Sequence, residues 1–358
     1  SDDPTGAARA ERALAGIGRA DADQRSVDAS VNSMTLAEGA LDNANDLLQD
    51  ARETLMKAGN ATYGDSERKE LATHLRDLRQ QLLAIANRSD AAGNYLFGGQ
   101  GSIGAPFLDT AGGVQFRGAA GSTQVPSSES LPSTVDGNNA WMQAGTGNGV
   151  FETNAQTTNG SGWIDKGRVT DPAAITGSSY SIAFGVSGGA TTYSVLKDGV
   201  PTALAGVPFE SGKSIEFDGM SMAVTGAPAD GDTFTVNPST PDLTVFDALD
   251  KAASALETPN HTSGEIAQIN QNGIRDIDSV AGRLQSVRGQ VGDTLNRADA
   301  ATDRLSASRL ASQTEQVNAT GLDMARGISD FKNTQVNYDT ALKSYGLIQQ
   351  MSLFKYIG

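Results

Sequence analysis

The sequence predicts an α+β protein in which both chain ends form a long antiparallel helical bundle or coiled-coil rod, with an inserted β-rich antiparallel domain between them. Of the 41 glycines and 11 prolines in the 358 residues, 25 and 9 lie between positions 98 and 241. These residues interrupt helices, whereas the Ala, Leu, Gln and Arg that dominate both flanks propagate them. The flanks also carry apolar residues at helical spacing, and the middle carries short stretches in which apolar and polar residues alternate.

Composition excludes several classes of function. The formal net charge of −15 argues against a general binder of nucleic acid or of anionic membranes. The chain has no cysteine, which excludes disulfides, thiolate zinc sites, iron–sulfur clusters and thiol nucleophiles, and its two histidines are His74 and His261. No apolar run approaches the length that spans a bilayer. The sequence starts at Ser1, without an initiator methionine and without a signal-peptide pattern. We therefore expect it to begin within a longer natural sequence.

The first helical arm has a seven-residue repeat of apolar residues. The repeat consists of Val27, Met34, Leu41, Leu48 and Leu55, with Ser30, Ala37, Ala44 and Ala51 three positions after its first four members. This spacing predicts a coiled-coil seam whose alternate layers are small enough for a close neighbouring helix. Residues 60–66 then predict a turn that ends in an N-cap, with Glu67 in the first turn of the next helix.

The second arm predicts one long helix over residues 67–97. Its apolar residues alternate four and three apart, and the same register continues through Ser89 and Ala92 to Leu96. The members before Ser89 are Leu71, Leu75, Leu78, Leu82 and Ile85. Such a helix would be roughly 45 Å long.

The third arm begins after Pro241. Thr262-Ser-Gly-Glu265 has the form of a capping box, which predicts a helix start. The helix that follows carries the same four-three spacing at Ile277, Val280, Leu284, Val287 and Val291, with Leu295 and Leu305 extending the stripe. An ordinary buried bundle explains the stripes within residues 10–310.

The final segment, residues 319–358, fits an ordinary bundle less well. It is an amphipathic helical sequence with many aromatic residues at a chain terminus, where a monomer usually frays. An apolar terminal helix without a partner in its own chain implies a partner in another chain or in residues before Ser1. The candidate subunit-packing residues are Met324, Ile328, Phe331, Val336, Tyr338, Leu342, Tyr345, Ile348, Met351, Leu353, Phe354, Tyr356 and Ile357.

The middle of the chain predicts a small antiparallel sandwich or barrel. Residues 180–184 and 192–195 alternate around Ser187-Gly-Gly189, which is typical of a hairpin. Three further short strands are expected at 214–218, 222–225 and 232–236, and residues 107–125 are expected to add a hairpin against the helices. The predicted domains are 1–135 (helical rod, first part, with the hairpin), 136–241 (inserted β domain), 242–318 (helical rod, second part) and 319–358 (carboxy-terminal helix).

No motif supports a catalytic, cofactor or metal site. Residues 185–189 match the G-x-S-x-G pattern of hydrolases, but a second strand follows in place of a helix, so a hairpin turn is expected. The glycines of residues 145–149 indicate a flexible linker, and residues 230–232 indicate a turn more than a calcium loop. His74 is expected to flank an apolar stripe, His261 to be solvated, and the acidic residues of the arms to lie on solvated helix faces.

Several segments resemble the bacterial flagellin superfamily. Residues 1–10 are similar to the segment that follows its amino-terminal helix, and residues 37–49 to its next long helix. Ile85-Ala-Asn-Arg88 leading into Tyr95-Leu-Phe-Gly-Gly99, and the ending of residues 352–357, resemble the hook-associated protein 3 family more than filament flagellin. Phe217-x-Gly219, with the glycines, proline and aromatic residue that follow up to position 234, resembles a β motif of flagellar hook-associated and capping proteins.

The resemblance implies a non-catalytic structural subunit of the flagellum that forms the junction ring between hook and filament. The implied partners are hook-associated protein 1, flagellin, the filament cap protein during assembly, other copies of the same chain and a flagellar export chaperone, without nucleic acid, membrane insertion or a cofactor. The resemblance also implies an extracellular location after type III export without a cleaved signal. Residues 319–358 would then be an inner-tube helix that pairs with a segment preceding Ser1.

Two alternatives remain open from the sequence. A filament flagellin would polymerise by itself, whereas a junction protein would not. A surface module that binds carbohydrate or a host would use Trp141 and Trp163 to stack on sugars, although both fit buried or linker positions as well.

Overall fold

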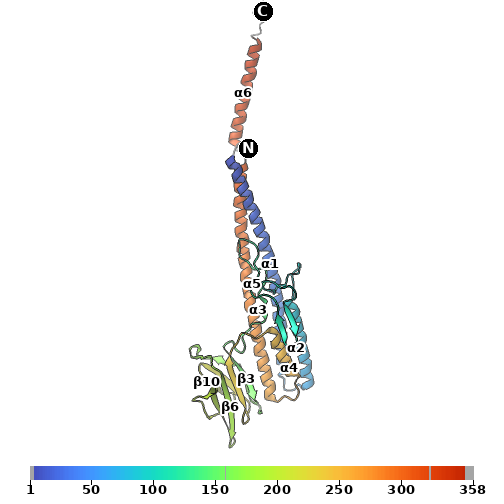
Figure 1. The fold of residues 1–358 in the computed structure, drawn as a ribbon, viewed down its shortest axis with the longest axis vertical. Coiled ribbons are helices and arrows are strands. Elements are labelled where there is room, and N and C mark those ends of the chain that lie inside the picture. The colour runs from blue at the N-terminus through green and yellow to red at the C-terminus, as the bar shows by residue number, and fades with distance from the viewer. Residues whose placement is uncertain (1–3, 158, 322–323, 351–358) are drawn as a thin grey trace, which may run out of the picture. The chain divides into compact units, whose positions relative to one another are not determined.

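A computed structural model describes residues 4–157, 159–321 and 324–350 of the protein (Figure 1). The chain divides into two compact units. The larger unit is residues 25–301, and the smaller combines residues 1–24 with 302–358. Two long helices, α1 (Pro4–Ala58) and α5 (Ser263–Thr320), contribute residues to both units. The α+β class and the inserted antiparallel domain predicted from the sequence are confirmed.

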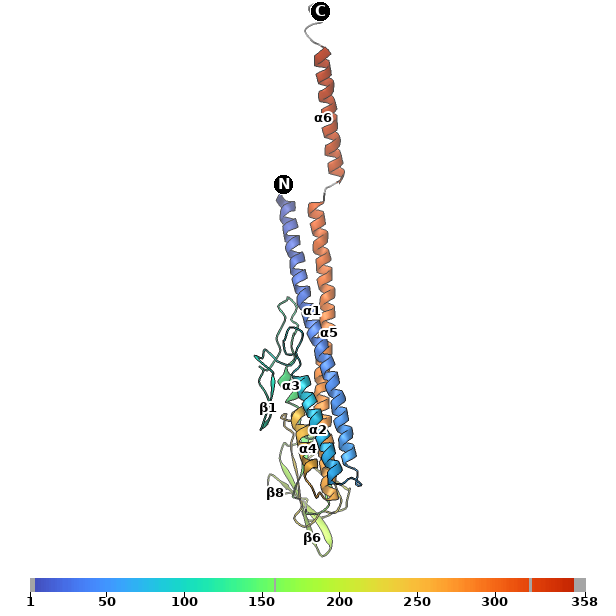
Figure 2. The same cartoon turned by 90° about the vertical axis from the view of Figure 1, so that its right-hand side faces the viewer.

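The helical part of the larger unit contains α2 (Asp65–Ala86), the short α3 (Gly137–Trp141) and α4 (Val245–Glu257) beside α1 and α5. Figure 2 shows α2 and α4 running alongside the two long helices, and α2 packs against α4. None of the helices that the structure describes combines the length and apolar content needed to cross a membrane.

The predicted apolar stripes form the core of this part. The five members of the α1 repeat from Val27 to Leu55 are at most 2 % exposed, and the small residues between them are fully buried. The α5 stripe from Ile277 to Val291 is buried against the same cluster. Small alternate layers let the helices approach closely, and the apolar area removed from water stabilises the bundle.

An aromatic cluster holds the predicted hairpin to the helices. The hairpin consists of β1 (Phe107–Thr110) and β2 (Gly113–Phe116), paired antiparallel. Phe107 contacts Phe116, Trp141 and Phe246 with ring centroids 5.2, 6.2 and 5.9 Å away. Trp141 is therefore a buried core residue, which removes it from any sugar-binding surface.

The prediction of a helix over residues 67–97 is wrong at its carboxyl end, because α2 ends at Ala86. The side chain of Asn87 donates to the carbonyl oxygen of Phe107 and accepts from its backbone N–H, both at 2.9 Å. Asp90 then accepts from the backbone N–H groups of Ala92 and Asn94 and fixes a turn. These local hydrogen bonds take the place of the bonds that would continue the helix, so the four-three spacing beyond Ile85 does not correspond to a helix.

Two helix starts test the predicted caps. Thr262 and Glu265 form the expected capping box: Glu265 N–H donates to Thr262 Oγ1 at 3.2 Å, and Thr262 N–H donates to Glu265 Oε2 at 2.7 Å. At α2 the N-cap is Gly64, so the helix begins at Asp65, and Glu67 accepts a hydrogen bond from the backbone N–H of Gly64 at 3.0 Å.

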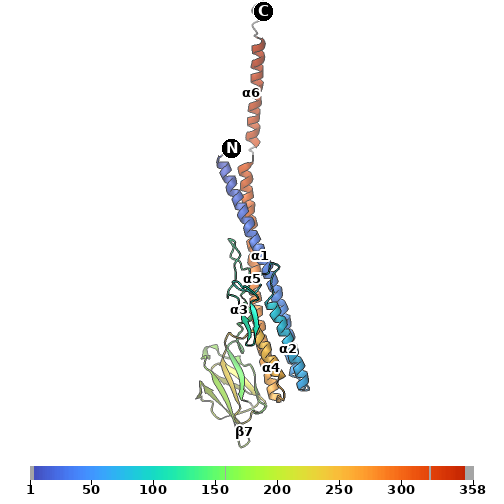
Figure 3. The same cartoon turned by 45° about the vertical axis from the view of Figure 1, so that its right-hand side comes forward.

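The inserted domain contains two antiparallel sheets. Its strands are β3 (Phe151–Thr157), β4 (Trp163–Ile164), β5 (Arg168–Val169), β6 (Tyr180–Ser187), β7 (Ala190–Lys197), β8 (Val200–Pro201), β9 (Val207–Pro208), β10 (Ser214–Phe217), β11 (Met220–Thr225) and β12 (Thr233–Pro238). One sheet has the order β3-β12-β6-β7-β8, with β9 also on β7, and the other has the order β10-β11-β4, with β5 also on β11. Figure 3 shows the domain beside the helices.

The β domain has its own apolar core. Ile182 and Phe234 from the larger sheet and Ile164, Met222 and Val224 from the smaller one are buried in a single cluster that is separate from the helical core. The expected β6–β7 hairpin is confirmed, with Ser187 opposite Ala190 across the two glycines. Both glycines have positive φ, at 61° and 78°, as this two-residue turn requires.

The glycine-rich residues 145–149 are more ordered than the expected flexible linker. Ala144 and Leu243 exchange two backbone hydrogen bonds of 2.9 and 3.1 Å, and Thr146 N–H donates to Thr240 at 2.9 Å. Asn148 Oδ1 accepts from two backbone N–H groups that follow it, each at 3.0 Å. The two connections to the β domain thus run together as a hydrogen-bonded ribbon.

The smaller unit contains α1 residues 4–24, α5 residues 302–320 and α6 (Met324–Gln350). Its first two helices meet through small residues: Gly6, Ala13 and Ala20 are buried and continue the seven-residue repeat toward the amino terminus. Arg309 forms an ion pair of 3.2 Å with Asp21 across this contact.

Charge is divided unevenly between the units. The larger unit holds 32 acidic and 18 basic residues, a net charge of −14, whereas the smaller unit holds ten and nine. Almost the whole negative charge of the chain therefore belongs to residues 25–301.

Candidate functional site

The candidate subunit-packing residues lie on or beyond α6. Met324 begins the helix, and the seven candidates from Ile328 to Ile348 lie within it. Those seven side chains are 52–70 % exposed. Met351, Leu353, Phe354, Tyr356 and Ile357 lie outside the described residues. The described helix therefore presents a concentration of large apolar side chains to its surroundings.

Most of these side chains form one stripe along the helix. Ile328, Phe331, Tyr338, Leu342 and Tyr345 follow a four-three spacing in which Gln335 is the one polar member. At roughly 100° per residue, this spacing places them on one narrow face. Leu347 is also exposed, but it lies about 140° around the helix from Leu342. The stripe has the pattern of a coiled-coil seam, and every described residue from 328 to 349 is exposed.

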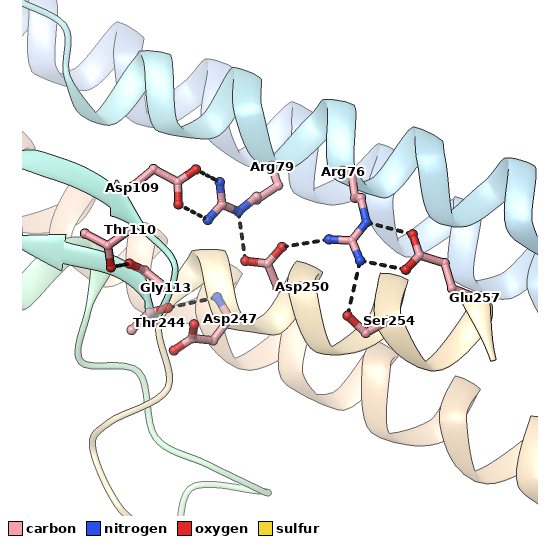
Figure 4. Close-up of polar contacts among 10 residues, drawn as sticks. All are labelled: Arg76, Arg79, Asp109, Thr110, Gly113, Thr244, Asp247, Asp250, Ser254 and Glu257. Carbon is pink, nitrogen blue, oxygen red and sulfur yellow. Dashed lines mark hydrogen bonds and ion pairs between the residues drawn. The ribbon is translucent and has the colours of Figure 1, made fainter.

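A second candidate is the polar cluster between α2, α4 and the β1–β2 hairpin (Figure 4). The guanidinium of Arg79 donates two hydrogen bonds to the carboxylate of Asp109 and one of 2.8 Å to Asp250. One turn away, Arg76 donates two bonds of 2.7 Å to Glu257 and one of 3.5 Å to Asp250. Asp250 therefore bridges the two arginines.

The charged groups of this cluster pair with one another and so link α2, α4 and the β1–β2 hairpin. The Arg79 side chain is 6 % exposed, and its hydrogen bonds to Asp109 raise its pKa. The same bonds hold the pKa of Asp109 below its ordinary value, and the bonds from Arg76 lower the pKa of Glu257. Arg76, Arg79, Asp109 and Glu257 are each held in the charged form by a partner, so none of these four groups is poised to exchange a proton near neutral pH.

Sequence reasoning missed this cluster because it assigned the acidic residues of the helical arms to solvated faces and gave Arg76 and Arg79 no role. In the structure the Arg79 side chain is buried, as are the apolar residues Leu75 and Leu78 of the same helix. The available signal was the spacing: Arg76 and Arg79 lie three residues apart, and Asp250 and Glu257 lie seven apart, so each pair shares a helix face.

The other motifs have structural roles. Ser187 lies in the β6–β7 hairpin, as expected. Asp232 is buried and accepts backbone hydrogen bonds from Asn159, Gly160 and Ala229, which fixes its turn. Over the described residues, no group of three or more His, Asp or Glu side chains is arranged to hold a metal ion.

The two histidines differ. His74 is exposed and lies 3.2 Å from Asp50. The expectation that His261 is solvated is wrong: its side chain is 13 % exposed, and Nε2 lies 2.8 Å from the carbonyl oxygen of Ala255. The His261 ring therefore links the segment before α5 to the last turn of α4.

Two known families match parts of the chain. Residues 1–102 match the bacterial flagellin N-terminal helical region. Residues 152–238 match the D2-like domain of flagellar hook-associated protein 1. The second match covers the β motif at Phe217, which resembled flagellar hook-associated proteins in the sequence.

Individual relatives are flagellar hook-associated proteins. The chain is 32 % identical over 124 residues to flagellar hook-associated protein 3 of Escherichia coli K12, covering 35 % of this chain and 36 % of that one. It is 33 % identical over 102 residues to the same protein of Salmonella typhimurium, covering 28 % and 32 %. The aligned part spans about a third of the length of these curated relatives.

Solved structures extend the similarity over most of the chain. The crystal structure of flagellar hook-associated protein-3 from Legionella pneumophila has a TM-score of 0.81 at 27 % identity and covers 87 % of this chain and 99 % of that one. The FlgL structure from Xanthomonas campestris has a TM-score of 0.74 at 27 % identity and covers 84 % and 99 %. The resemblance to the hook-associated protein 3 family is confirmed, in preference to filament flagellin.

Proposed function

From its similarity to flagellar hook-associated protein 3 in both sequence and fold, we propose that this chain is a structural subunit of the bacterial flagellum at the junction between hook and filament. It acts by packing its helices against other subunits. The single observation that carries the proposal is the exposed apolar stripe of α6, which has the spacing of a coiled-coil seam.

The energetics favour a covered stripe in the assembled state. Full burial of a large apolar side chain gains about 1.5–3 kcal/mol, and the members of this stripe are already partly covered by the helix itself, so each gains less. Summed over the stripe, the gain competes with the loss of rotational and translational freedom on association. A segment such as residues 319–358 would therefore pair with helices of the assembled flagellum as its inner-tube helix.

The proposed partners are other copies of the chain in a ring, hook-associated protein 1 on the hook side and flagellin on the filament side. The filament cap protein would be a transient neighbour, and an export chaperone would hold the chain before type III export without a cleaved signal. The names of the relatives, which are flagellar hook-associated and junction proteins, support these partners in general terms. They also support a non-enzymatic role.

Two matched substitutions on α6 test the proposal. Leu342→Glu puts a carboxylate on the stripe, and Leu347→Glu makes the same change on another face of the same helix, at 52 % and 63 % exposure. Both add a residue that favours helix, so the melting temperature of the purified chain should stay the same. In the bacterium that carries the gene, Leu342→Glu should leave hooks without filaments and release flagellin into the medium.

Leu347→Glu should give normal filaments in electron micrographs. Equal loss in both variants would contradict packing through the stripe, and full filaments with Leu342→Glu would contradict the proposed role. Long filaments formed by the purified chain alone would indicate a flagellin.

A further inference from the structure

The β domain contacts α5 along one line. Gln268 accepts from the backbone N–H of Ile164 at 2.9 Å and donates to its carbonyl oxygen at 3.2 Å. Arg275 donates to the carbonyl oxygen of Thr153 at 2.7 Å, and Ser279 donates to that of Gly145 at 2.5 Å. All three side chains of α5 bind backbone atoms of the β domain or of its connecting ribbon.

The contact line occupies a narrow sector of the helix. Its first member is Gly264, where an added Cβ would lie 2.4 Å from the carbonyl oxygen of Ser161, so the chains touch there too. At roughly 100° per residue, Gly264, Gln268, Arg275 and Ser279 fall within about 60° of one another. The β domain therefore rests on a single ridge of α5.

This ridge is polar, and among the residues that the structure describes no apolar core crosses it. The buried apolar residues of the helices and those of the β domain form two separate clusters. Contacts between domains that are polar and limited in area permit relative movement, whereas a shared apolar core prevents it. The helical part and the β domain are thus each stabilised by an apolar core of their own, and they meet at α5.

A cavity lies on each flank of the ridge. The first, of about 550 Å³, is lined by Trp163 of the β domain, by the α1–α2 turn and by α5 residues that include Ala267, Asn270 and Ile274. The second, of about 320 Å³, is lined by Glu152 and Asn154 of the β domain, by α4, and by α5 residues that include Asn272 and Asp276. By the same helical arithmetic, the α5 residues of the two cavities lie on opposite sides of the contact line.

Polar groups line both cavities, which are open to solvent. The side-chain oxygen of Asn270, in the first cavity, is buried without a hydrogen-bond partner. The second cavity is lined by charged groups, among them Lys251, Arg275 and Asp276. Native proteins pair most of their buried polar atoms, so the unpaired oxygen of Asn270 indicates that the first flank is not fully packed.

The covalent connection is suited to a hinge. The two chain segments that enter and leave the β domain form the hydrogen-bonded ribbon at Ala144–Leu243 and Thr146–Thr240. The ribbon contains no helix, and Gly147 and Gly149 have positive φ values of 65° and 88°. Hinges are commonly a few loop residues that absorb the change in backbone angles.

We infer that the β domain, residues 151–238, rocks on the Gly264–Ser279 ridge of α5, closing the cavity on one flank as it opens the other. The helical core stays unchanged during this motion, because its apolar cluster takes no residue from the β domain. The inference goes beyond the proposed function and does not depend on it, since every contact lies within residues 59–279.

Distance measurements between spin labels test the motion, and the absence of cysteine makes labelling simple. One pair joins the bodies, Asp77→Cys on α2 with Val200→Cys on β8, and the reference pair stays within the helices, Asp77→Cys with Leu36→Cys on α1. All three positions are exposed. The inter-body distance distribution should be at least about twofold wider than the reference.

Two further variants give the proposal its controls. Gln268→Ala removes both bonds to Ile164 and should widen the inter-body distribution, without changing the reference pair. Ala267→Trp adds bulk to the first cavity and Ala255→Phe adds bulk to the second. The double variant should narrow the inter-body distance distribution, and circular dichroism checks that it folds. An inter-body distribution as narrow as the reference, unchanged by Gln268→Ala, would overturn the inference.

Discussion

In α1 the apolar residues that recur every seven positions from Val27 to Leu55 are at most 2 % exposed, whereas the members of a similar stripe in α6 are 52–70 % exposed. The two stripes share a spacing and differ in what covers them. In α1 the cover comes from α2, α4 and α5 of the same unit. Spacing therefore specifies the helix and its apolar face, and the surroundings decide whether that face is buried in the fold or stays exposed.

The largest expected effect is on the free energy of unfolding, when one leucine is truncated in the α1 stripe and one in the α6 stripe. Leu48→Ala leaves a cavity in the helical core and should lower the free energy of unfolding by about 2–5 kcal/mol. Leu342→Ala removes an exposed side chain and should change it by less than about 0.5 kcal/mol. Urea unfolding followed by circular dichroism measures both, and similar losses in the two variants would show that α6 is covered within its own chain.

A second comparison sets a buried arginine against an exposed one. Arg79 and Arg288 each bind two carboxylates on neighbouring elements, but their side chains are 6 % and 38 % exposed. Arg79→Met takes the guanidinium away from Asp109 and leaves Asp250 with Arg76 alone. It should lower stability by about 2 kcal/mol, less than for a fully buried pair because Asp109 is 37 % exposed.

Arg288→Met is the control and should cost less than about 1 kcal/mol, as for ordinary surface pairs. The same urea experiment compares them. If both variants lost equal stability, burial of Arg79 would have no energetic consequence.

The smallest effect is a pH dependence with two opposing parts. Asp109 and Glu257 have lowered pKa values in the folded chain, so their contribution is present above the ordinary carboxyl range and is lost as the pH falls through their folded pKa values. Burial raises the pKa of Asp276, so its contribution is greatest at low pH and is lost as the pH rises through its folded pKa.

Stability measured from about pH 6 to about pH 3 should therefore fall. The fall should be shallower in Glu257→Gln and steeper in Asp276→Asn. A steeper acid loss in Glu257→Gln would contradict the assigned direction of its shift.

Much of the fold could be predicted because its signals are local and repeated. The α1 stripe, the capping box at Thr262 and the glycine turn between β6 and β7 each specify one structure through spacing or backbone conformation. The end of α2 could not, because Asn87 stops the helix through a bond to Phe107, twenty residues away.

The polar contacts could not be predicted from the sequence either, because their partners are also far away along the chain. Arg79 depends on carboxylates from two other elements, and Gln268 on the backbone of Ile164, more than a hundred residues distant. Single charged or amide residues carry no period, so a sequence pattern assigns them to solvent. The apolar stripe of α6 was recognisable from its spacing, and its role in packing stays a prediction.

The division of charge between the two units has a consequence for association. In the proposed ring, residues 25–301 of neighbouring copies would lie near one another, each set with a net charge of −14. Their mutual repulsion reaches only about 10 Å at 0.1 M ionic strength and farther in dilute buffer. Added salt should therefore strengthen association between copies, and multivalent cations should do so at lower concentration than sodium.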